Sequence, residues 1–344
     1  MARRCARASA CETLSSVRSR HCRIAPFSQN WGQGVGGLGA GRDGGLGARG
    51  TKIDERFYPR RNFGWLEPEY SDYGRARAVV LPVPYDSTTT ARAGAREGPQ
   101  AIIDASADME LFDLAIEREP FRSGVHTLPE VAVHAGSPAA MVERVRQLAG
   151  ELIDDGKLVI TLGGEHSIAI GSALAHTDRM PNVSILYLDA HADFRESYMD
   201  TPYNHACTLR RIAESGVPAV HVGMRSADID ELGALREMGI PSFPAHKFRH
   251  PAEVADQVIA GLRDEVYVSV DLDVFDSGLL PAVGTPEPGG LNWYDVTDLL
   301  AAVAGKRRIV GFDLMELAPE YGPRAGAQLA AKLAYRMLGL ALSE

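Results

Sequence analysis

Six side chains able to bind metal ions follow three strand-like segments in the second half of the sequence. They are His166 after Leu158–Leu162, Asp189, His191 and Asp193 after Val183–Leu188, and Asp271 and Asp273 at the end of Val266–Val270. Alternate residues of an extended chain point to one face, so the i, i+2 spacing of Asp271 and Asp273 places both carboxylates side by side. Acids at the ends of buried strands are costly unless they are paired or bound to metal, which favours a common metal site.

This set of ligands predicts a dinuclear hydrolytic centre. A divalent ion lowers the pKa of bound water, and two ions about 3.5–4 Å apart act together on one water nucleophile. Four carboxylates and two imidazoles without a thiolate suit Mn²⁺ better than structural zinc. By affinity order alone, Ni²⁺, Co²⁺ or Zn²⁺ would also fit this site.

The surrounding sequence alternates strand-like and helix-like segments. Strands are predicted at residues 78–84, 158–162, 183–188, 219–223, 266–270 and 308–312, and helices opening at 98 and spanning 141–152, 251–262, 293–303 and 326–342. Such alternation predicts an α/β fold with a mostly parallel sheet covered by helices on both faces. Ligands of such sheets bind outside the carboxyl ends of the strands, where the six side chains lie.

Composition narrows the class of protein. The chain has 344 residues, 45% of them apolar, and a net charge of −9 without a basic stripe in its body. This argues against nucleic acid as a partner, and no apolar run reaches the roughly 20 residues that span a bilayer. Three of the four cysteines lie near the start and only Cys207 lies in the body, so we expect no disulfide framework and a reducing, intracellular compartment.

The first 50 residues differ from the rest of the chain. They are rich in Arg, Ser and Gly, are nearly free of acids, and show no helical or strand period. We predict a disordered extension or an over-extended start over residues 1–50, and a single catalytic domain over residues 51–344. The composition of the extension also fits an organelle transit peptide, so the expected cytoplasmic location has this one alternative.

The chain resembles the ureohydrolases, the family of arginase, agmatinase, guanidinobutyrase and formimidoylglutamase, and among them most closely the agmatinases. The resemblance runs from about Phe63 to the C-terminus. It rests on four motifs in combination, which are Gly163-Gly164-Glu165-His166-Ser167, Asp189-Ala190-His191-Ala192-Asp193, Ser269-Val270-Asp271-Leu272-Asp273 and Gly284-Thr285-Pro286-Glu287-Pro288-Gly289-Gly290. Gly94-Ala95-Arg96-Glu97-Gly98-Pro99 is similar to the loop that opens the first crossover helix of the family.

The resemblance implies an arginase-like, three-layer α/β/α fold around an eight-stranded, mostly parallel sheet, with two Mn²⁺ per subunit and assembly into a homotrimer or homohexamer. It implies that Asp189 and Asp271 bridge the two ions. The remaining ligands would be His166 and Asp193 at one ion, and His191 and Asp273 at the other.

The resemblance also assigns roles to His205 and Glu316. His205 falls where the family places a proton-shuttling histidine, and Glu316 where it places the carboxylate that holds the guanidinium. Both roles are physically sound. A carboxylate accepts the paired N–H groups of a planar guanidinium, and an imidazole that titrates near neutrality can protonate a leaving amine.

Three departures from the family pattern affect the choice of substrate and the metal environment. Glu165 stands where many relatives carry Asp, and Arg195 stands where arginases carry a neutral residue that contacts the far end of the substrate. An inward-facing Arg195 would repel the distal ammonium of agmatine. The third departure is the long loop Glu196-Ser197-Tyr198-Met199-Asp200, whose acids could instead receive that ammonium.

We predict hydrolysis of agmatine to putrescine and urea. The alternatives are guanidinobutyrate, guanidine or another guanidino compound, and, in a different class, an inactive metal-binding assembly protein.

Overall fold

Eight short segments pair into one parallel sheet in the computed structural model, which describes residues 60–249 and 251–342. The strands are β1 (Ala78–Val83), β2 (Val125–Thr127), β3 (Leu158–Gly163), β4 (Val183–Leu188), β5 (Ala219–Val222), β6 (Ser242–Phe243), β7 (Glu265–Asp271) and β8 (Arg308–Met315). Their order across the sheet is β2-β1-β3-β8-β7-β4-β5-β6, and every pairing is parallel. The six strands predicted from apolar runs are confirmed. The edge strands β2 and β6 are too short to leave such a pattern.

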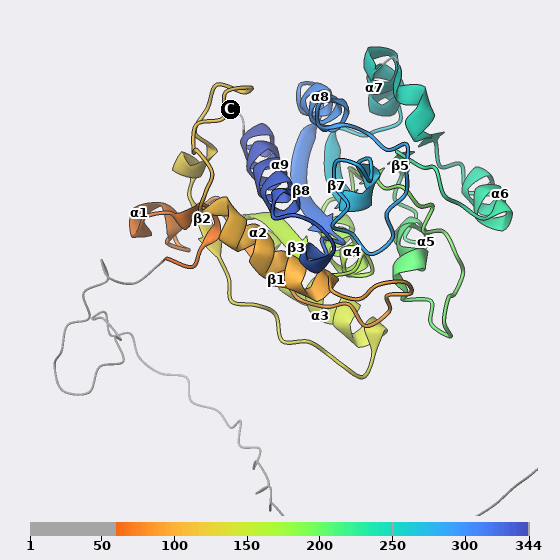
Figure 1. Cartoon of the computed structure of the whole chain (residues 1–344), viewed down its shortest axis with the longest axis horizontal. Coiled ribbons are helices and arrows are strands. Elements are labelled where there is room, and N and C mark those ends of the chain that lie inside the picture. Colours follow the sequence, from red (N-terminus) through yellow and green to blue (C-terminus); the bar gives the residue numbers. More distant parts are fainter. Residues whose placement is uncertain (1–59, 250, 343–344) are drawn as a thin grey trace, which may run out of the picture. The chain divides into compact units, whose positions relative to one another are not determined.

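Helices cover both faces of the sheet (Figure 1). They are α1 (Pro68–Ser71), α2 (Gly98–Ser106), α3 (Pro138–Asp154), α4 (Ile168–Arg179), α5 (Thr208–Ala213), α6 (Ile229–Glu237), α7 (Pro251–Ala260), α8 (Trp293–Ala304) and α9 (Ala325–Ala341). In β1, Ala78 and Val80 belong to the same buried cluster as residues of α2, α8 and α9, whereas Val79 and Leu81 belong to a second cluster with residues of α3 and α4. This alternation gives the expected three layers, with a core on each side of the sheet.

The four motif-bearing strands are neighbours in the centre of the sheet. The order β3-β8-β7-β4 brings together the carboxyl ends that precede His166, Glu316, Asp273 and Asp189. Since parallel strands end at the same edge, side chains from distant parts of the sequence meet there.

Two predictions from the sequence concern the N-terminal extension and membrane-spanning segments. The predicted boundary at residue 50, and the extension before it, lie outside the described residues. Among the residues that are described, no helix has the length and apolar character needed to cross a membrane.

Candidate metal centre

The turn after β3 requires two glycines. A Cβ on Gly163 would lie 1.9 Å from Sδ of Met315, and a Cβ on Gly164 would lie 1.9 Å from the carbonyl oxygen of Tyr85. The amide of Glu316 donates to the carbonyl of Gly164 at 2.8 Å. The glycine pair therefore lets the ends of β1, β3 and β8 approach closely, and His166 follows at the edge where these strands end.

His166 lies at the centre of a group of carboxylates. Its Nδ1 atom is 3.0 Å from Oδ2 of Asp189, 3.1 Å from Oδ2 of Asp271 and 3.4 Å from Oδ2 of Asp193. All four side chains are buried. One oxygen or nitrogen from each of His166, Asp189 and Asp271 falls within the spacing that a single metal ion requires.

A second group shares Asp189 with the first. Nδ1 of His191 lies 2.8 Å from Oδ2 of Asp273 and 3.6 Å from Oδ1 of Asp189. Asp189, His191 and Asp273 form the second set with ligand spacing. The two oxygens of Asp189 thus face different histidines, as a carboxylate between two ions would. The structure places Asp271 in the first set only.

The charges of these groups are strongly coupled. Burial raises the pKa of Asp189 to about 6, and burial followed by the charges of Asp273 and Asp189 raises the pKa of Asp271 well above its usual value. Burial alone would lower the pKa of His166, but the surrounding carboxylates raise it far above normal. The cluster therefore holds excess negative charge that a cation would neutralise.

The donor set fits divalent cations. Oδ2 of Asp189 is buried and has no hydrogen-bond partner among the described residues. Carboxylate oxygens and imidazole nitrogens without thiolates match the ligands of Mn²⁺ and related ions.

A buried hydrogen-bonded chain holds the far side of His166. Nε2 of His166 lies 2.9 Å from Oγ of Ser269, and this hydroxyl donates to Oδ1 of Asp313 at 2.9 Å. Tyr267 donates to the other oxygen of Asp313 at 2.6 Å. Because the hydroxyl of Ser269 is directed to Asp313, its oxygen accepts from Nε2–H of His166. Nδ1 is thereby turned toward the carboxylates, as is usual for a histidine that binds metal.

Tyr187 supports the same histidine from β4. Its ring stacks on that of His166 with centroids 4.7 Å apart and an interplanar angle of 5°. Its hydroxyl donates to Oδ2 of Asp193 at 2.8 Å and lies 3.0 Å from Nδ1 of His166. Tyr187 therefore fixes two of the predicted ligands relative to one another.

His205 and Glu316 lie beside the metal-ligand groups. Oε1 of Glu316 is 3.8 Å from Nδ1 of His205 and accepts the amide of His166 at 2.7 Å. Glu316 and Asp193 both have positive φ angles, of 67° and 48°. Such backbone strain at non-glycine residues is typical of functional sites, where the surrounding structure holds it.

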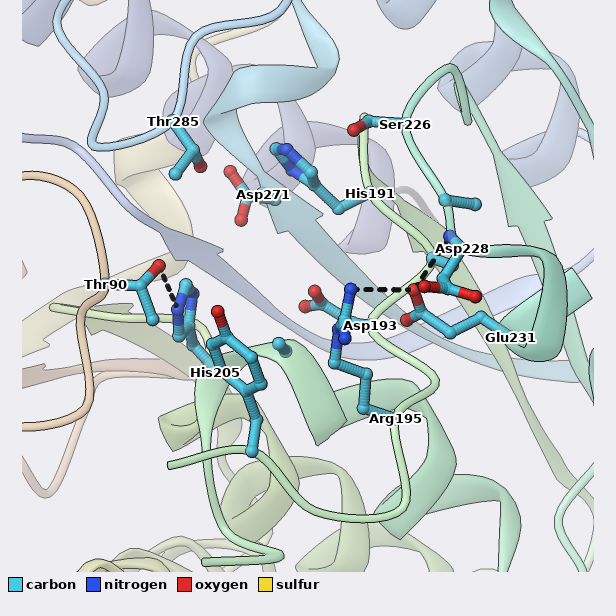
Figure 2. A pocket seen from close by; sticks show the side chains of 14 residues that line it. Thr90, His191, Asp193, Arg195, His205, Ser226, Asp228, Glu231, Asp271 and Thr285 are labelled. Carbon is cyan, nitrogen blue, oxygen red and sulfur yellow. Dashed lines mark hydrogen bonds and ion pairs between the residues drawn. The ribbon is translucent and has the colours of Figure 1, made fainter. Parts of the chain in front are cut away.

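A cavity of about 380 Å³ opens beside His205 and several of the predicted metal ligands (Figure 2). Glu316 is not among the residues that line it. The side chains that line it include Thr90, His191, Asp193, His205, Asp271 and Thr285, together with Arg195, Tyr198, Asp228 and Glu231. In Figure 2 the hydroxyl of Thr90 faces His205, and the side chains of Arg195, Asp228 and Glu231 gather on another wall of the cavity.

The structure places the three residues expected to contact the far end of the substrate in different surroundings. Arg195 lines the cavity, where its guanidinium lies 3.7 Å from Oε2 of Glu231 and 4.9 Å from the ring centroid of Tyr198. Glu196 is exposed and lies 3.9 Å from Arg210, and Asp200 is exposed. Neither Glu196 nor Asp200 lines the cavity. Arg195 therefore contacts both the first turn of α6, through Glu231, and its own loop, through Tyr198.

Sequence reasoning assigned no role to several residues of the site. Tyr187 and Ser269 each precede a predicted ligand by two positions in a strand, so strand periodicity would have placed them on the same face. Asp228 and Glu231 carry a helix-start signal, and the structure shows them as a capping box of α6. Nothing in the sequence pairs Arg195 with Glu231, because that contact depends on how the loop after β4 meets the first turn of α6.

Comparisons with known proteins agree with this geometry. The model of the arginase family matches residues 76–339. The N(1)-aminopropylagmatine ureohydrolase of Thermus thermophilus is 39% identical over 268 residues, which cover 78% of this chain and 91% of the relative. The agmatinase of Pyrococcus horikoshii is 32% identical over 286 residues, which cover 82% of this chain and 98% of the relative.

The fold is also similar to a solved structure. The agmatine ureohydrolase of Thermoplasma volcanium superposes with a TM-score of 0.76 at 29% identity. The match covers 83% of this chain and 96% of that chain.

Proposed function

The chain belongs to the arginase family and is a ureohydrolase of the agmatinase type, and on this basis we propose that its substrate is N1-aminopropylagmatine. Hydrolysis breaks the bond between the amidino carbon and the alkyl-bearing nitrogen. The amidino carbon, its two terminal nitrogens and the oxygen of water leave as urea, and the alkyl-bearing nitrogen remains as an amine of spermidine. The supporting observation is that the cavity does not end in a closed wall. Asp228 and Tyr198 line it and are exposed, so a substrate longer than agmatine can continue past them. Similarity to relatives named for this compound supports the same choice.

Charge on the cavity wall that carries Arg195, Asp228 and Glu231 supports a cationic tail of the substrate. Oε1 of Glu231 accepts the amide of Phe194, Oε2 accepts the amide of Asp228, and Arg195 lies 3.7 Å from Oε2. Oδ1 of Asp228 accepts the amide of Asp230, and no ion pair to Asp228 occurs in the described part of the chain. With Arg195 opposed by Glu231, Asp228 adds a free negative charge that attracts the ammonium groups of a polyamine.

We propose that Glu316 binds the guanidinium. Its Oε1 atom accepts the amide of His166, which leaves Oε2 for a guanidinium N–H. Burial, followed by the charge of Glu165, raises the pKa of Glu316 to about 8. A guanidinium placed against it favours the ionised carboxylate, so substrate binding and ionisation of Glu316 support each other.

We propose that His205 gives a proton to the departing amine. Its side chain lies in the cavity wall, and burial lowers its pKa, with partial compensation from Asp193. An imidazole in the wall of the cavity can accept and release a proton during the reaction. The hydroxyl of Thr90, 3.3 Å from Nε2, helps to orient the ring.

We propose that two Mn²⁺ ions are held by His166, Asp189, His191, Asp193, Asp271 and Asp273. When bound, such ions lower the pKa of water and supply the nucleophile at neutral pH. The protein positions the guanidinium through Glu316 and the proton donor through the loop that carries His205.

Agmatine is the second candidate, because it shares the guanidino and butyl parts of the proposed substrate. Guanidinobutyrate is disfavoured because Arg195, a cation in the cavity wall that could attract its carboxylate, already lies beside Glu231. A cavity of about 380 Å³ is far larger than free guanidine needs. An inactive protein would have no use for His205 and Glu316 beside the ligand set.

The test is urea release by the Mn²⁺-loaded protein with each of the four compounds. We expect the largest kcat/KM for N1-aminopropylagmatine and the next largest for agmatine. A larger value for agmatine would reject the proposed substrate and keep the reaction. Absence of urea from all four compounds would reject the reaction itself.

A matched pair of variants tests the contribution of Asp228. Asp228→Asn keeps a good helix cap, whereas Asp230→Asn changes a second exposed acid in the first turn of α6 that does not line the cavity. We expect Asp228→Asn to lower kcat/KM for the proposed substrate by about 2- to 5-fold, as an exposed ion pair is worth at most about 1 kcal/mol. Asp230→Asn should have no such effect.

A cytoplasmic location and a homotrimeric or homohexameric state stay predictions.

A further inference from the structure

Glu165 accepts three hydrogen bonds in a fully buried position beside the metal centre. Its Oε2 atom accepts the amide of Thr88 at 2.5 Å, and Oε1 accepts the hydroxyl of Thr88 at 2.6 Å. The hydroxyl of Ser167 donates to Oε1 at 2.5 Å. Two of the three bonds therefore come from one residue of the loop between β1 and α2, which is distant in the sequence.

Thr88 in turn holds the segment that carries His205. Its hydroxyl oxygen accepts the amide of His205 at 3.0 Å, and its carbonyl accepts the side-chain amide of Asn204 at 3.3 Å. The hydroxyl hydrogen of Thr88 is directed to Glu165, which leaves the oxygen free to accept from His205. The same loop also presents Thr90 to the ring of His205 (Figure 2).

These contacts link two parts of the site through one carboxylate. Glu165 precedes His166 directly, so the turn that positions a metal ligand also positions Thr88. We propose that Glu165 is a positioning residue that fixes His205, through Thr88, relative to the metal centre. The inference rests on the proposed role of His205 as proton donor.

The length of the side chain is part of the proposal. Aspartate at this position would be shorter by one carbon–carbon bond, about 1.5 Å. The two hydrogen bonds to Thr88 would then stretch, or the loop would have to move toward the turn. A displacement of about 1 Å in a catalytic group can cost on the order of 100-fold in rate.

Three substitutions at two neighbouring threonines test the link. Thr88→Val removes the hydroxyl at nearly constant volume, and Thr88→Ser keeps the hydroxyl. Thr89→Val is the matched control, since the hydroxyl of Thr89 donates only to the carbonyl of Asp86 in the same loop.

The first readout does not depend on activity. Hydrogen exchange of the backbone amide of His205 should become faster in Thr88→Val and in Glu165→Asp, because its acceptor is lost or displaced. It should be unchanged in Thr88→Ser and Thr89→Val. Unchanged exchange in Thr88→Val overturns the proposal, whatever the substrate proves to be.

The second readout is the kinetic profile of the metal-loaded protein. We expect Thr88→Val and Glu165→Asp to lower kcat by about 10- to 100-fold with the KM and the bound metal unchanged, and Thr88→Ser to restore kcat. A fall in melting temperature or in metal content that accounts for the lost activity would mean a structural role only, and would overturn the proposal.

A double-mutant cycle identifies the residue through which Thr88 acts. In the background His205→Asn, the addition of Thr88→Val should lower kcat no further, because its target is already absent. An equal loss in both backgrounds overturns the proposal. If the unmodified protein releases no urea from any guanidino compound, the proposed function fails, while the exchange experiment still decides the link from Glu165 to His205.

Discussion

The carboxylate cluster should make folding stability depend on divalent metal. An ion that binds only the folded state at 100 times its Kd stabilises that state by about 2.7 kcal/mol. A domain of this size has an entropy of unfolding of about 0.6 kcal/mol per kelvin. Each Mn²⁺ ion bound under these conditions should therefore raise the melting temperature by about 4–5 °C. Thermal unfolding before and after chelation, at constant ionic strength, measures the shift.

Asp271→Asn should change the stability of the protein in opposite directions without metal and with metal. The pKa of Asp271 is raised by burial and by Asp273 and Asp189, so its ionised form opposes folding. An acid with a raised pKa contributes less stability as the pH rises from its unfolded value through its folded value. Without metal at pH 7, the variant should therefore be more stable than the unmodified protein and should unfold at a higher temperature. With metal, it should be the less stable of the two.

Asp276→Asn is the matched control for this prediction. Hydrogen bonding from the amide of Gly278, followed by those of Gly289 and Gly290, lowers the pKa of Asp276. Its removal should lower stability with and without metal and leave the shift caused by Mn²⁺ unchanged. If the metal-free Asp271→Asn protein were less stable than the unmodified protein, the carboxylate would stabilise the fold by itself and the reasoning would be wrong.

Three further predictions concern metal binding, pH and the N-terminal extension. Tyr187→Phe removes the hydroxyl that donates to Asp193 and should weaken Mn²⁺ binding by about 10-fold in a calorimetric titration. Tyr335 is also buried but lies away from the site, so Tyr335→Phe should leave the affinity for Mn²⁺ unchanged. Equal affinities in the two variants would contradict the role of the Tyr187 hydroxyl. Burial lowers the pKa of His176 to about 4, so the stability it contributes is present above pH 6.5 and is lost as the pH falls toward 4. The free energy of unfolding of the metal-free protein in urea should therefore fall between pH 7.5 and 5 by about 2 kcal/mol less in His176→Gln than in the unmodified protein. An equal fall in both proteins would refute this. Deletion of residues 1–50 should leave kcat/KM and the melting temperature unchanged, because the segment lacks apolar periodicity. A large fall in either quantity would show that the segment contributes to the activity or the stability of the catalytic domain.

Local patterns in the sequence predicted the layers of this fold and the proposed set of metal ligands. Apolar runs followed by acids and histidines predict covered parallel strands, and parallel strands end at one edge. His166, Asp189 and Asp271 could therefore be grouped before their distances were known. Strand periodicity would also have found Tyr187 and Ser269, because each lies two positions before a ligand.

Only the tertiary structure decided how those strands are ordered and what surrounds the ligands. The order β3-β8-β7-β4 makes neighbours of strands that are separated in the sequence by whole helices. Thr88 lies 77 residues from Glu165 and 117 from His205, yet it contacts both. Spacing within a strand is a local property of the chain, whereas contacts between loops depend on the path of the whole backbone. For this reason the pairing of Arg195 with Glu231 and the support of His205 by Thr88 had to be read from the fold.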